Sequence, residues 1–444
     1  MKSILNLLVC FPILLIGCGK QVVPLGQGWA LPTEVAHSKD GLVGGVDLYK
    51  WQNTIMVLQE LDGGSAKCFT MAGNSNTWRE VKLVGIPHGY LWAYPAIDQT
   101  GDKVFFEQGY MENDQLVMKA LVGRLTDGTA VRDATEIQWI TDKNTLFEKA
   151  PPNIRLNDPG KRNWPSLGVG LINGSDFYIP YRLVGEAWIG NGISGDDSLF
   201  NNGVFCSSDS GKVWRCEKIS DLEAWLPSLC KTKDYFYYLA VKNAQCDLWF
   251  SRKPVQGGSW SEPTVITANF CNSALYWQYI AVAGNDTIHV CWLDRRHEKK
   301  RFSLEDSRRN NFEVAYCHRK DTENGWTKDV ILSKGLPYSY SPTMSVEGNK
   351  VIIVWTGSEN DDRLTDIFYV TSKDGAETWT KPLKVTNGAK DGLIAGKPQV
   401  MLLNGVIHLF YIQGKRESQE LSSGLTKLNQ EPWPIYYTQR PFPD

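Results

Sequence analysis

The sequence lacks several features that mark common functional classes. It has no long basic run, and its 47 Lys and Arg nearly balance its 49 Asp and Glu, so the formal net charge is −2. Nucleic acid is therefore not expected as the main partner, because binding it requires a basic surface. There is also no Cys-x-x-Cys pair and no cluster of His and Cys, so we predict neither a metal site nor a cofactor.

Long hydrophobic runs are scarce as well. The N-terminal run, residues 4–16, follows the positive charge of Lys2 and is shorter than the roughly 20 residues that a transmembrane helix needs. Such a run is typical of a secretory signal. Residues 15–18 resemble a bacterial lipobox in which Cys18 is lipidated, and an ordinary signal with a chance cysteine is the alternative. We expect a signal peptide over 1–17, a tether over 18–38, and an exported protein, periplasmic or on the cell surface, whose only contact with the membrane is its lipid anchor.

Aromatic residues, glycine and proline are abundant along the chain, which favours many short strands joined by turns. One unit contains a strand-like run over 341–346, a turn at Gly348-Asn349, and further runs over 351–355 and 366–371. A tryptophan then opens the last strand-like run of the unit, and four strands in this space are typical of a propeller blade. Tryptophans in equivalent positions are Trp78, Trp214, Trp260, Trp326 and Trp379.

The units recur without a linker between them. We count seven, beginning near residues 39, 90, 164, 223, 272, 340 and 395. Repetition at this period indicates one closed domain over 39–444. The fold class that we predict is all-β, a β-propeller of six to seven four-stranded blades. The count leaves open whether a terminal unit is split or closes the ring.

Two segments share a specific spacing. Ser207, Asp209, Gly211 and Trp214 follow the pattern S-x-D-x-G-x-x-W, and Ser372, Asp374 and Trp379 repeat it. This pattern is an Asp-box, which marks the hairpin between the last two strands of a blade in sialidase-like β-propellers, also called BNR-repeat propellers. The chain therefore resembles that superfamily over nearly its whole mature length. We expect the box residues to be structural, with side chains that bond turn amides and a tryptophan that packs between blades.

Export makes disulfides possible. Cys206 and Cys216 bracket the first box, so we expect them to pair across its hairpin. The other cysteines lie on strand-like segments, where we expect small buried residues. They are Cys68, Cys230, Cys246, Cys271, Cys291 and Cys317.

The resemblance also implies where a site lies and what it contains. Sites in this superfamily lie around the axis, on the face that carries the connections from second to third strands and from each blade to the next. Sialidases use three arginines that clamp a carboxylate, a Tyr–Glu pair that forms the nucleophile, and an Asp that acts as acid and base. Candidates by residue type and loop are Arg182, Arg295, Arg296 and Arg363 for the clamp, Tyr338 or Tyr340 with Glu223 or Glu359 for the nucleophile, Asp294 or Asp361 for the acid, and Trp225 as a sugar platform.

The catalytic resemblance is partial. The first unit, residues 46–59, contains no Arg where sialidases carry an Arg-Ile-Pro type motif, and Tyr178-Ile179-Pro180 lacks the Arg. We therefore expect a carbohydrate-active propeller that binds a glycan, first as a sialidase-like glycoside hydrolase acting on an acidic glycan. Two alternatives stay open: a glycan-binding or scaffold propeller without catalysis, and a polysaccharide lyase with a Tyr or His base.

Overall fold

A computed structural model describes about two thirds of the chain, and its longest continuous stretch is in the C-terminal half. The described residues contain β-strands and one short 3-10 helix, η4 (Ala389–Asp391). No helix among them has the length and apolar character needed to cross a membrane. The described residues are 26, 28–37, 46–51, 53–60, 66–72, 77–83, 96–97, 103–112, 115–126, 130–137, 165–167, 170–183, 188–189, 192–193, 201–210, 215–220, 224–242, 247–267, 279–294, 312–360, 364–415, 418–420, 426–428 and 433–443.

The first half of the described chain forms two four-stranded groups and one of five strands, which we call blades one to three. The first two are joined into an eight-stranded sheet by parallel pairing of β5 with β9. Blade one contains β2 (Val46–Trp51), β3 (Thr54–Glu60), β4 (Ala66–Ala72) and β5 (Arg79–Leu83). Blade two contains β6 (Ala96–Ile97), β7 (Lys103–Glu112), β8 (Gln115–Thr126) and β9 (Ala130–Ile137). Blade three contains β10 (Pro165–Leu167) with β11 (Leu171–Asn173), then β12 (Asp176–Leu183), β15 (Asn201–Ser207) and β16 (Arg215–Ser220).

The second half forms blades four to seven, each a separate antiparallel sheet. Blade four contains β17 (Ala224–Lys231), β18 (Tyr235–Lys242), β19 (Asp247–Pro254) and β20 (Thr264–Thr267). Blade five contains β21 (Tyr279–Ala283), β22 (Thr287–Asp294), β23 (Glu313–Lys320) and β24 (Val330–Ile331). Blade six contains β25 (Tyr338–Glu347), β26 (Lys350–Ser358), β27 (Asp366–Ser372) and β28 (Leu383–Lys384). Blade seven contains β29 (Leu393–Leu403), β30 (Val406–Lys415), β33 (Pro434–Pro441) and β1 (Thr33–His37).

Two small ribbons interrupt the order of strands. The pair β13 (Trp188–Ile189) and β14 (Gly192–Ile193) lies between the second and third strands of blade three. The pair β31 (Ser418–Glu420) and β32 (Thr426–Leu428) occupies the same place in blade seven. The extra chain of both blades is thus inserted in the connection from the second to the third strand.

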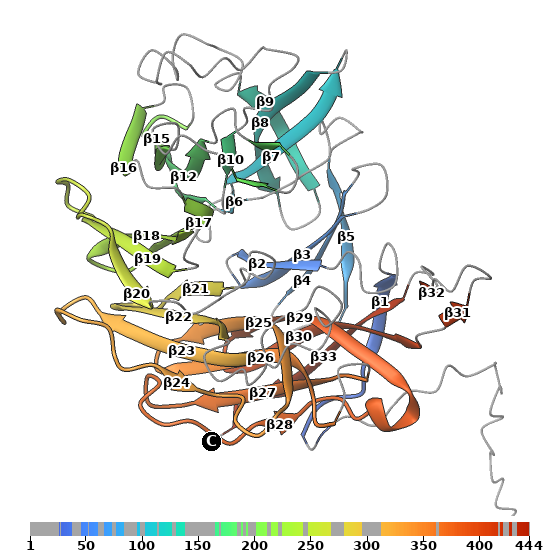
Figure 1. Cartoon of the computed structure of the whole chain (residues 1–444). Coiled ribbons are helices and arrows are strands. Elements are labelled where there is room, and N and C mark those ends of the chain that lie inside the picture. Colours follow the sequence, from blue (N-terminus) through green and yellow to red (C-terminus); the bar gives the residue numbers. More distant parts are fainter. Residues whose placement is uncertain are drawn as a thin grey trace, which may run out of the picture.

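The first strands of the blades form a closed circle. Each contacts the next, in the order β2, β6, β11, β17, β21, β25 and β29, and β29 contacts β2 again. The other strands of each blade follow outward from this circle (Figure 1). The described chain therefore forms an all-β propeller, and the prediction of six to seven four-stranded blades is confirmed.

The ring is closed by the N-terminal strand. β1 pairs antiparallel with β33 and becomes the outermost strand of blade seven, so strands from both ends of the chain lie side by side (Figure 1). The segment before it is also packed on the propeller, since the Gly26 amide donates to the Val385 carbonyl over 2.6 Å. These residues lie in the segment 18–38 that the sequence assigns to a tether. The propeller thus begins before residue 39.

Tryptophans pack between blades, as the repeat predicts. The indole ring lies edge-on against an aromatic ring in the third strand of the preceding blade, a favoured geometry for aromatic pairs. Ring centroids are 4.9 to 5.5 Å apart in these pairs. The pairs are Trp326 with Phe250, Trp379 with Tyr316, Trp29 with Tyr369, and Trp78 with Tyr437.

The predicted box residues stabilise hairpin turns. The Ser372 hydroxyl donates to Asp374 over 2.7 Å and accepts from the Ala376 amide, and the Thr378 amide donates to Asp374. Hydrogen bonds from the Thr378 side chain and backbone and from Ser372 lower the pKa of Asp374 to about 2. In the first segment Ser207 donates to Asp209 over 2.7 Å. These contacts give the four box residues a structural role.

Positive φ angles occur at two successive positions of the second box, Gly375 at 74° and Ala376 at 75°. In the first box the described residue with positive φ is Ser210, at 64°. Gly211 and Trp214 lie outside the described residues. Residues other than glycine, Ser210 and Ala376, therefore also adopt the left-handed conformation in these hairpins.

The expected disulfide between Cys206 and Cys216 is wrong. Cys206 is a free, buried thiol. In the register of β15 with β16, Cys216 lies opposite Phe205, while Cys206 lies opposite Arg215. The two cysteines are therefore not directly opposite each other across the hairpin. Burial also raises the pKa of the Cys206 thiol to about 12.

Backbone hydrogen bonds show which loops lie at the same end of the propeller. In three blades an amide of the last hairpin donates to a carbonyl of the first turn: Ser210 to Ser175, Asp321 to Asp286, and Gly375 to Asn349, over 2.8 to 2.9 Å. Both turns of a blade therefore lie at the same end of the propeller. The connections from second to third strands, and from one blade to the next, lie at the other end, which we call the long-loop face.

Candidate functional site

The sequence-predicted site residues fall into three groups in the structure. Asp294, Tyr338, Tyr340 and Glu359 are described with their side chains. Arg182 lies in β12 and Trp225 in β17, where only their backbone positions are described. Glu223, Arg295, Arg296, Asp361 and Arg363 lie outside the described residues, as does Cys18. The arginine clamp thus stays a prediction.

Tyr338 and Tyr340 lie near the start of β25, the first strand of blade six. Residues two apart in a strand point to the same side, and the two rings are stacked with centroids 6.3 Å apart and an interplanar angle of 18°. Both side chains are partly exposed. Sequence reasoning placed them in the loop before the strand, whereas the strand begins with them because they pair with Ser358 and Thr356 of β26. They form an aromatic pair at the long-loop face.

Asp294 is the last residue of β22, so it also lies at the long-loop face. Its side chain is fully buried and accepts a hydrogen bond from the Trp292 indole over 3.0 Å. It lies opposite Glu313, the first residue of β23. Asp294 thus orients a buried indole at the end of the strand, and its role as a general acid stays a prediction.

Three first strands contain the same irregularity, which sequence reasoning missed. β17, β25 and β29 each have a β-bulge that places two residues opposite one residue of the second strand. The first bulge residue has a positive φ: 52° at Leu226, 50° at Ser341 and 52° at Lys397. Positive φ is uncommon for residues other than glycine, and three equivalent instances on the innermost strands indicate a shared purpose.

The bulges expose side chains near the axis. Leu226 is 47% exposed although it is a large apolar residue of an innermost strand, and Lys397 is exposed too. The signal in the sequence is that each of these residues precedes a proline: Leu226-Pro227, Ser341-Pro342 and Lys397-Pro398. We call Leu226, Tyr338, Tyr340, Ser341 and Lys397 the inner-strand cluster.

Buried polar atoms without partners lie on β25, among the cluster residues, and on the neighbouring strand β26. Among the described residues, the side chains of Ser339, Trp355 and Thr356 each contain a buried nitrogen or oxygen atom that makes no hydrogen bond. Ser339 lies between the two tyrosines, and Trp355 lies opposite the bulge of β25. Since buried polar groups are nearly always satisfied, such a concentration is unusual.

The buried carboxylate of Asp366 binds the chain that follows β28, on the way to blade seven. Asp366, at the start of β27, is 2% exposed and accepts from the Thr386 hydroxyl and the Gly388 amide, each over 2.9 Å. Lys384 bonds Asp366 over 3.3 Å and Glu359 over 2.6 Å. Partial burial lowers the pKa of Lys384, but the hydrogen bond that Lys384 donates to Glu359 and the charge of Asp366 outweigh it and raise that pKa. Glu359, a candidate partner for the tyrosine, is thus held by Lys384.

The described residues give no indication of a metal centre. No group of three or more His, Cys, Asp and Glu within them is arranged to hold a metal ion. The described part of the long-loop face offers phenols, ammonium groups, hydroxyls and carboxylates, among them Tyr338, Tyr340, Lys397 and Glu359. This set suits recognition of a polar ligand with aromatic and charged contacts.

Comparisons with solved structures identify the class of fold. The polysaccharide lyase Uly1 aligns with a TM-score of 0.50 and 9% identity, covering 94% of this chain and 92% of that chain. The BP39L lectin from Burkholderia pseudomallei aligns with a TM-score of 0.50 and 14% identity, covering 90% and 99%. A mutant Trypanosoma rangeli sialidase that displays trans-sialidase activity aligns with a TM-score of 0.46 and 8% identity, covering 94% of this chain and 59% of that chain.

At such low identities these similarities show the fold alone. The β-propeller fold that the sequence predicts is thus shared with a polysaccharide lyase and a lectin. No protein-family model matches the sequence, and no curated protein matches it.

Proposed function

We propose that the protein is a carbohydrate-active propeller that binds an acidic glycan at its long-loop face and cleaves it as a glycoside hydrolase of the exo-sialidase type. The observation that carries the proposal is the stacked, partly exposed pair of Tyr338 and Tyr340 on an innermost strand. Aromatic rings with polar tips suit a sugar, which has apolar ring faces and polar edges. Neighbours with this fold include a lyase that acts on polysaccharide and a lectin.

The preference for an acidic glycan rests on cationic side chains. Lys397 is exposed on the innermost strand of the adjacent blade and has no ion-pair partner in the described part of the chain. The backbone of Arg182 lies at the next-to-last position of β12, the second strand of blade three, near the same face. A sugar carboxylate bound between such groups gains charge-assisted hydrogen bonds.

Hydrolysis of the sialidase type requires a nucleophilic phenol. One of the two tyrosines attacks the anomeric carbon, and a carboxylate takes its proton, an exception to the usual pair of carboxylates. A carboxylic acid then protonates the leaving oxygen. Glu223 and Asp294 are the candidates for the two carboxyl groups.

A polysaccharide lyase is the second candidate. The observation that favours it is the alignment of Uly1 over nearly the whole length of both chains. In this reaction Tyr338 or Tyr340 removes the proton beside a uronate carboxylate, while a cation neutralises that carboxylate. The neighbouring C–O bond then breaks to leave a C=C double bond, and the departing sugar oxygen takes up a proton. The same tyrosines therefore serve both candidates, and only the products differ.

The experiment compares two substrates with the same protein. A fluorogenic sialic acid glycoside reports hydrolysis, and a uronate polysaccharide reports elimination through the ultraviolet absorbance of its unsaturated product. Tyr338→Phe or Tyr340→Phe should reduce turnover about 100-fold or more, since the phenol is lost while the ring stays. Tyr235→Phe, which alters a tyrosine at the opposite end of the propeller, is the matched control and should leave turnover unchanged.

The outcomes separate the candidates. Release of the fluorescent aglycone supports the hydrolase, and an unsaturated product supports the lyase instead. If a folded protein turns over neither substrate but binds an acidic glycan, and Lys397→Ala weakens that binding, the protein is a glycan-binding propeller. Full activity of both tyrosine variants contradicts the proposed site.

We also propose that the protein is exported and held at a membrane by a lipid on Cys18. The run of apolar residues over 4–16 and the lipobox-like residues 15–18 support this. Cells that express the full chain and take up labelled palmitate should label the protein, and Cys18→Ala should abolish the label. Labelling of the variant to the same extent contradicts the proposal.

A further inference from the structure

The N-terminal segment is built into the outer edge of the propeller. The Gly26 amide donates to the Val385 carbonyl, directly after β28, over 2.6 Å. A Cβ atom on Gly26 would clash with the backbone carbonyl of Lys384, so glycine is required at this contact. Trp29 then packs edge-on against Tyr369 of β27, with ring centroids 5.5 Å apart. The chain is therefore fixed to the outermost strand of blade six from Gly26 onward.

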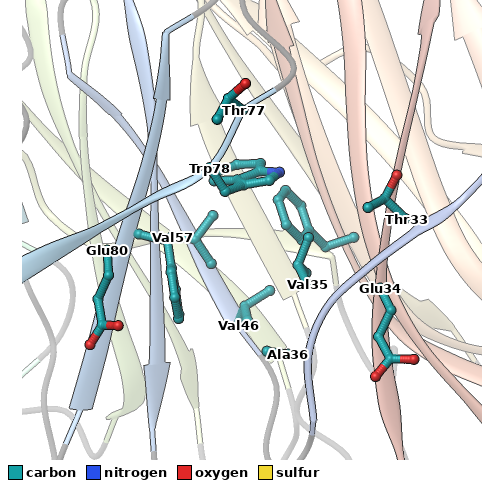
Figure 2. A pocket seen from close by; sticks show the side chains of 11 residues that line it. Thr33, Glu34, Val35, Ala36, Val46, Val57, Thr77, Trp78 and Glu80 are labelled. Atoms are coloured by element: carbon teal, nitrogen blue, oxygen red, sulfur yellow. The ribbon is translucent and has the colours of Figure 1, made fainter.

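The strand that follows is held on two sides. β1 pairs with β33 on one side, and on the other Val35 and Ala36 pack toward a core that contains Val46 and Val57 of blade one. Side chains of β1 and of blade one line a cavity of about 430 Å³ between them (Figure 2). β1 is thus a part of the propeller that cannot move away from the ring without exposing this core.

Leu31 occupies a position that is charged in other blades. In four blades the residue after the outer tryptophan donates its amide to a carbonyl of the third strand: Ser261 to Arg252, Thr327 to His318, Thr380 to Thr371, and Ala30 to Gln439. The next residue is exposed in all four blades. It is Glu262 in blade four, Lys328 in blade five and Lys381 in blade six, but Leu31 in blade seven.

Leu31 and Leu383 form an exposed apolar surface, which we call the rim patch. Leu31 is 81% exposed, the largest value among the large apolar residues that the structure describes, and Leu383 is 46% exposed. Leu383 lies opposite Tyr369 in the register of β27 with β28, and Tyr369 packs against Trp29, two residues before Leu31. Single exposed leucines are ordinary, but these two lie beside Gly26, where the chain from Cys18 reaches the propeller.

We propose that the rim patch rests on the lipid bilayer that holds the acyl chains of Cys18. The inference rests on the lipid anchor proposed above, and it adds which side of the propeller the membrane covers. Cys18 precedes Gly26 by eight residues, which span at most roughly 29 Å when fully extended. A compact domain of about 400 residues has a diameter of roughly 55 Å. The anchor is therefore too short for the opposite rim, near blade three, to face the bilayer.

This contact orients the glycan site. A ring that stands on its rim has its axis parallel to the membrane, so the long-loop face opens sideways along the membrane surface. A long glycan can then cross the inner-strand cluster without meeting the bilayer. Burial of the two leucines favours the orientation, since transfer of one leucine side chain out of water is favoured by a factor of about ten or more.

Fluorescence quenching by lipids measures the contact. The lipidated full-length protein is placed in vesicles of phosphatidylethanolamine and phosphatidylglycerol, with or without bromine on the acyl chains. An apolar fluorescent label is attached to the variant Leu383→Cys, and the parent protein, treated in the same way, gives the background from its own cysteines. Thr264→Cys is the matched control, because Thr264 is exposed and lies opposite Phe250 on the outer strand of blade four.

Brominated lipid should quench the label at position 383 several-fold more strongly than the label at position 264. Adding Leu31→Glu to Leu383→Cys introduces the residue that blade four has at the equivalent position, so the fold should tolerate it. It should lower the quenching at 383 toward the value at 264. Lys328→Gln changes the equivalent residue of blade five and should leave the quenching unchanged.

The outcomes separate the inference from the anchor on which it rests. Equal quenching at the two sites of a lipidated protein overturns the inference and leaves the anchor in place. Absence of quenching at 383, which is expected if a second copy of the chain covers the rim patch, also overturns it, as does quenching that Leu31→Glu leaves unchanged. If mass spectrometry finds no lipid on Cys18, the anchor and the inference are both overturned.

Discussion

Asp366→Ala should destabilise the protein more than any change to an exposed ion pair. Asp366 is 2% exposed and receives hydrogen bonds from the Thr386 hydroxyl and the Gly388 amide, both buried donors. It also holds the Ala389 amide at 3.3 Å and Lys384 at 3.3 Å. The substitution removes the common acceptor of these donors.

The magnitude follows from the number of donors that stay buried. Each buried donor that loses its acceptor costs about 1–3 kcal/mol, so Thr386 and Gly388 together give about 2–6 kcal/mol. Lys384 adds little, because its side chain is 27% exposed and keeps Glu359. Glu359→Gln removes the exposed partner of the same lysine, and its cost should stay within about 0–1 kcal/mol.

Urea-induced unfolding followed by tryptophan fluorescence measures the difference between the two variants. Asp366→Ala should lower the free energy of unfolding by about 4 kcal/mol, with Glu359→Gln close to the parent protein. Asp366→Asn should fall between them, since its amide oxygen still accepts but its NH₂ group faces a donor. Equal costs for Asp366→Ala and Glu359→Gln would refute the reasoning, because burial would then have no influence.

Three other changes test the buried groups. Burial lowers the pKa of His408 to about 4 from its ordinary value of 6.5, so its contribution to stability is complete above about pH 6.5 and is lost as the pH falls toward about 4. The free energy of unfolding measured in urea should therefore decrease as the pH falls from about 6.5 to about 4. The variant His408→Gln should show a smaller decrease over the same pH interval. Cys206 should resist iodoacetamide in the native protein and react after unfolding, and alkylation of the native thiol, measured by mass spectrometry, would contradict its burial. Trp379→Ala should cost about 3 kcal/mol, the lower end for a buried tryptophan, because the ring is only partly buried and loses its contact with Tyr316. Trp379→Phe should cost less, and thermal unfolding measures both; equal costs would show that the ring that phenylalanine keeps contributes nothing to the contact with Tyr316.

The parts of the fold that the sequence predicts are those fixed by local chemistry. The unit expected near 223 begins with β17 at Ala224, the unit near 340 with β25 at Tyr338, and the unit near 395 with β29 at Leu393. Turn residues and the recurring tryptophan are constrained by their immediate neighbours in every blade, so the pattern survives in the sequence. The box residues also make the hydrogen bonds that their spacing predicts.

The parts that failed depend on partners distant in sequence or on register. β1 is a five-residue strand whose partner, β33, lies at the opposite end of the chain. Nothing in the five residues identifies that partner. The pairing of Cys206 with Cys216 failed because the register of β15 with β16 does not place them opposite each other. Spacing across a hairpin does not fix that register.

The sequence predicts the end of the propeller at which the candidate site lies and the residue types in it. It does not predict the positions of those residues. Tyr338 and Tyr340 were expected in a loop, and the structure places them in β25 because their backbone continues the ladder with β26. The three bulges lie within strands and contain no charged motif, so the sequence pattern does not predict them. The recurring residue before proline at Leu226, Ser341 and Lys397 was visible in the sequence, but its meaning depends on the positive φ that only the structure gives.

These bulges give a physical reason to place recognition on the innermost strands rather than on the loops alone. A residue other than glycine held at positive φ costs on the order of 1–3 kcal/mol, and a regular strand would avoid that cost. The cost recurs in three blades with three different side chains, an apolar one, a hydroxyl and a cation. Since the backbone geometry is shared while the side chains differ, the bulge is a common scaffold and its first residue is the variable part. That division is expected of a site in which a rigid ring presents different groups to one ligand.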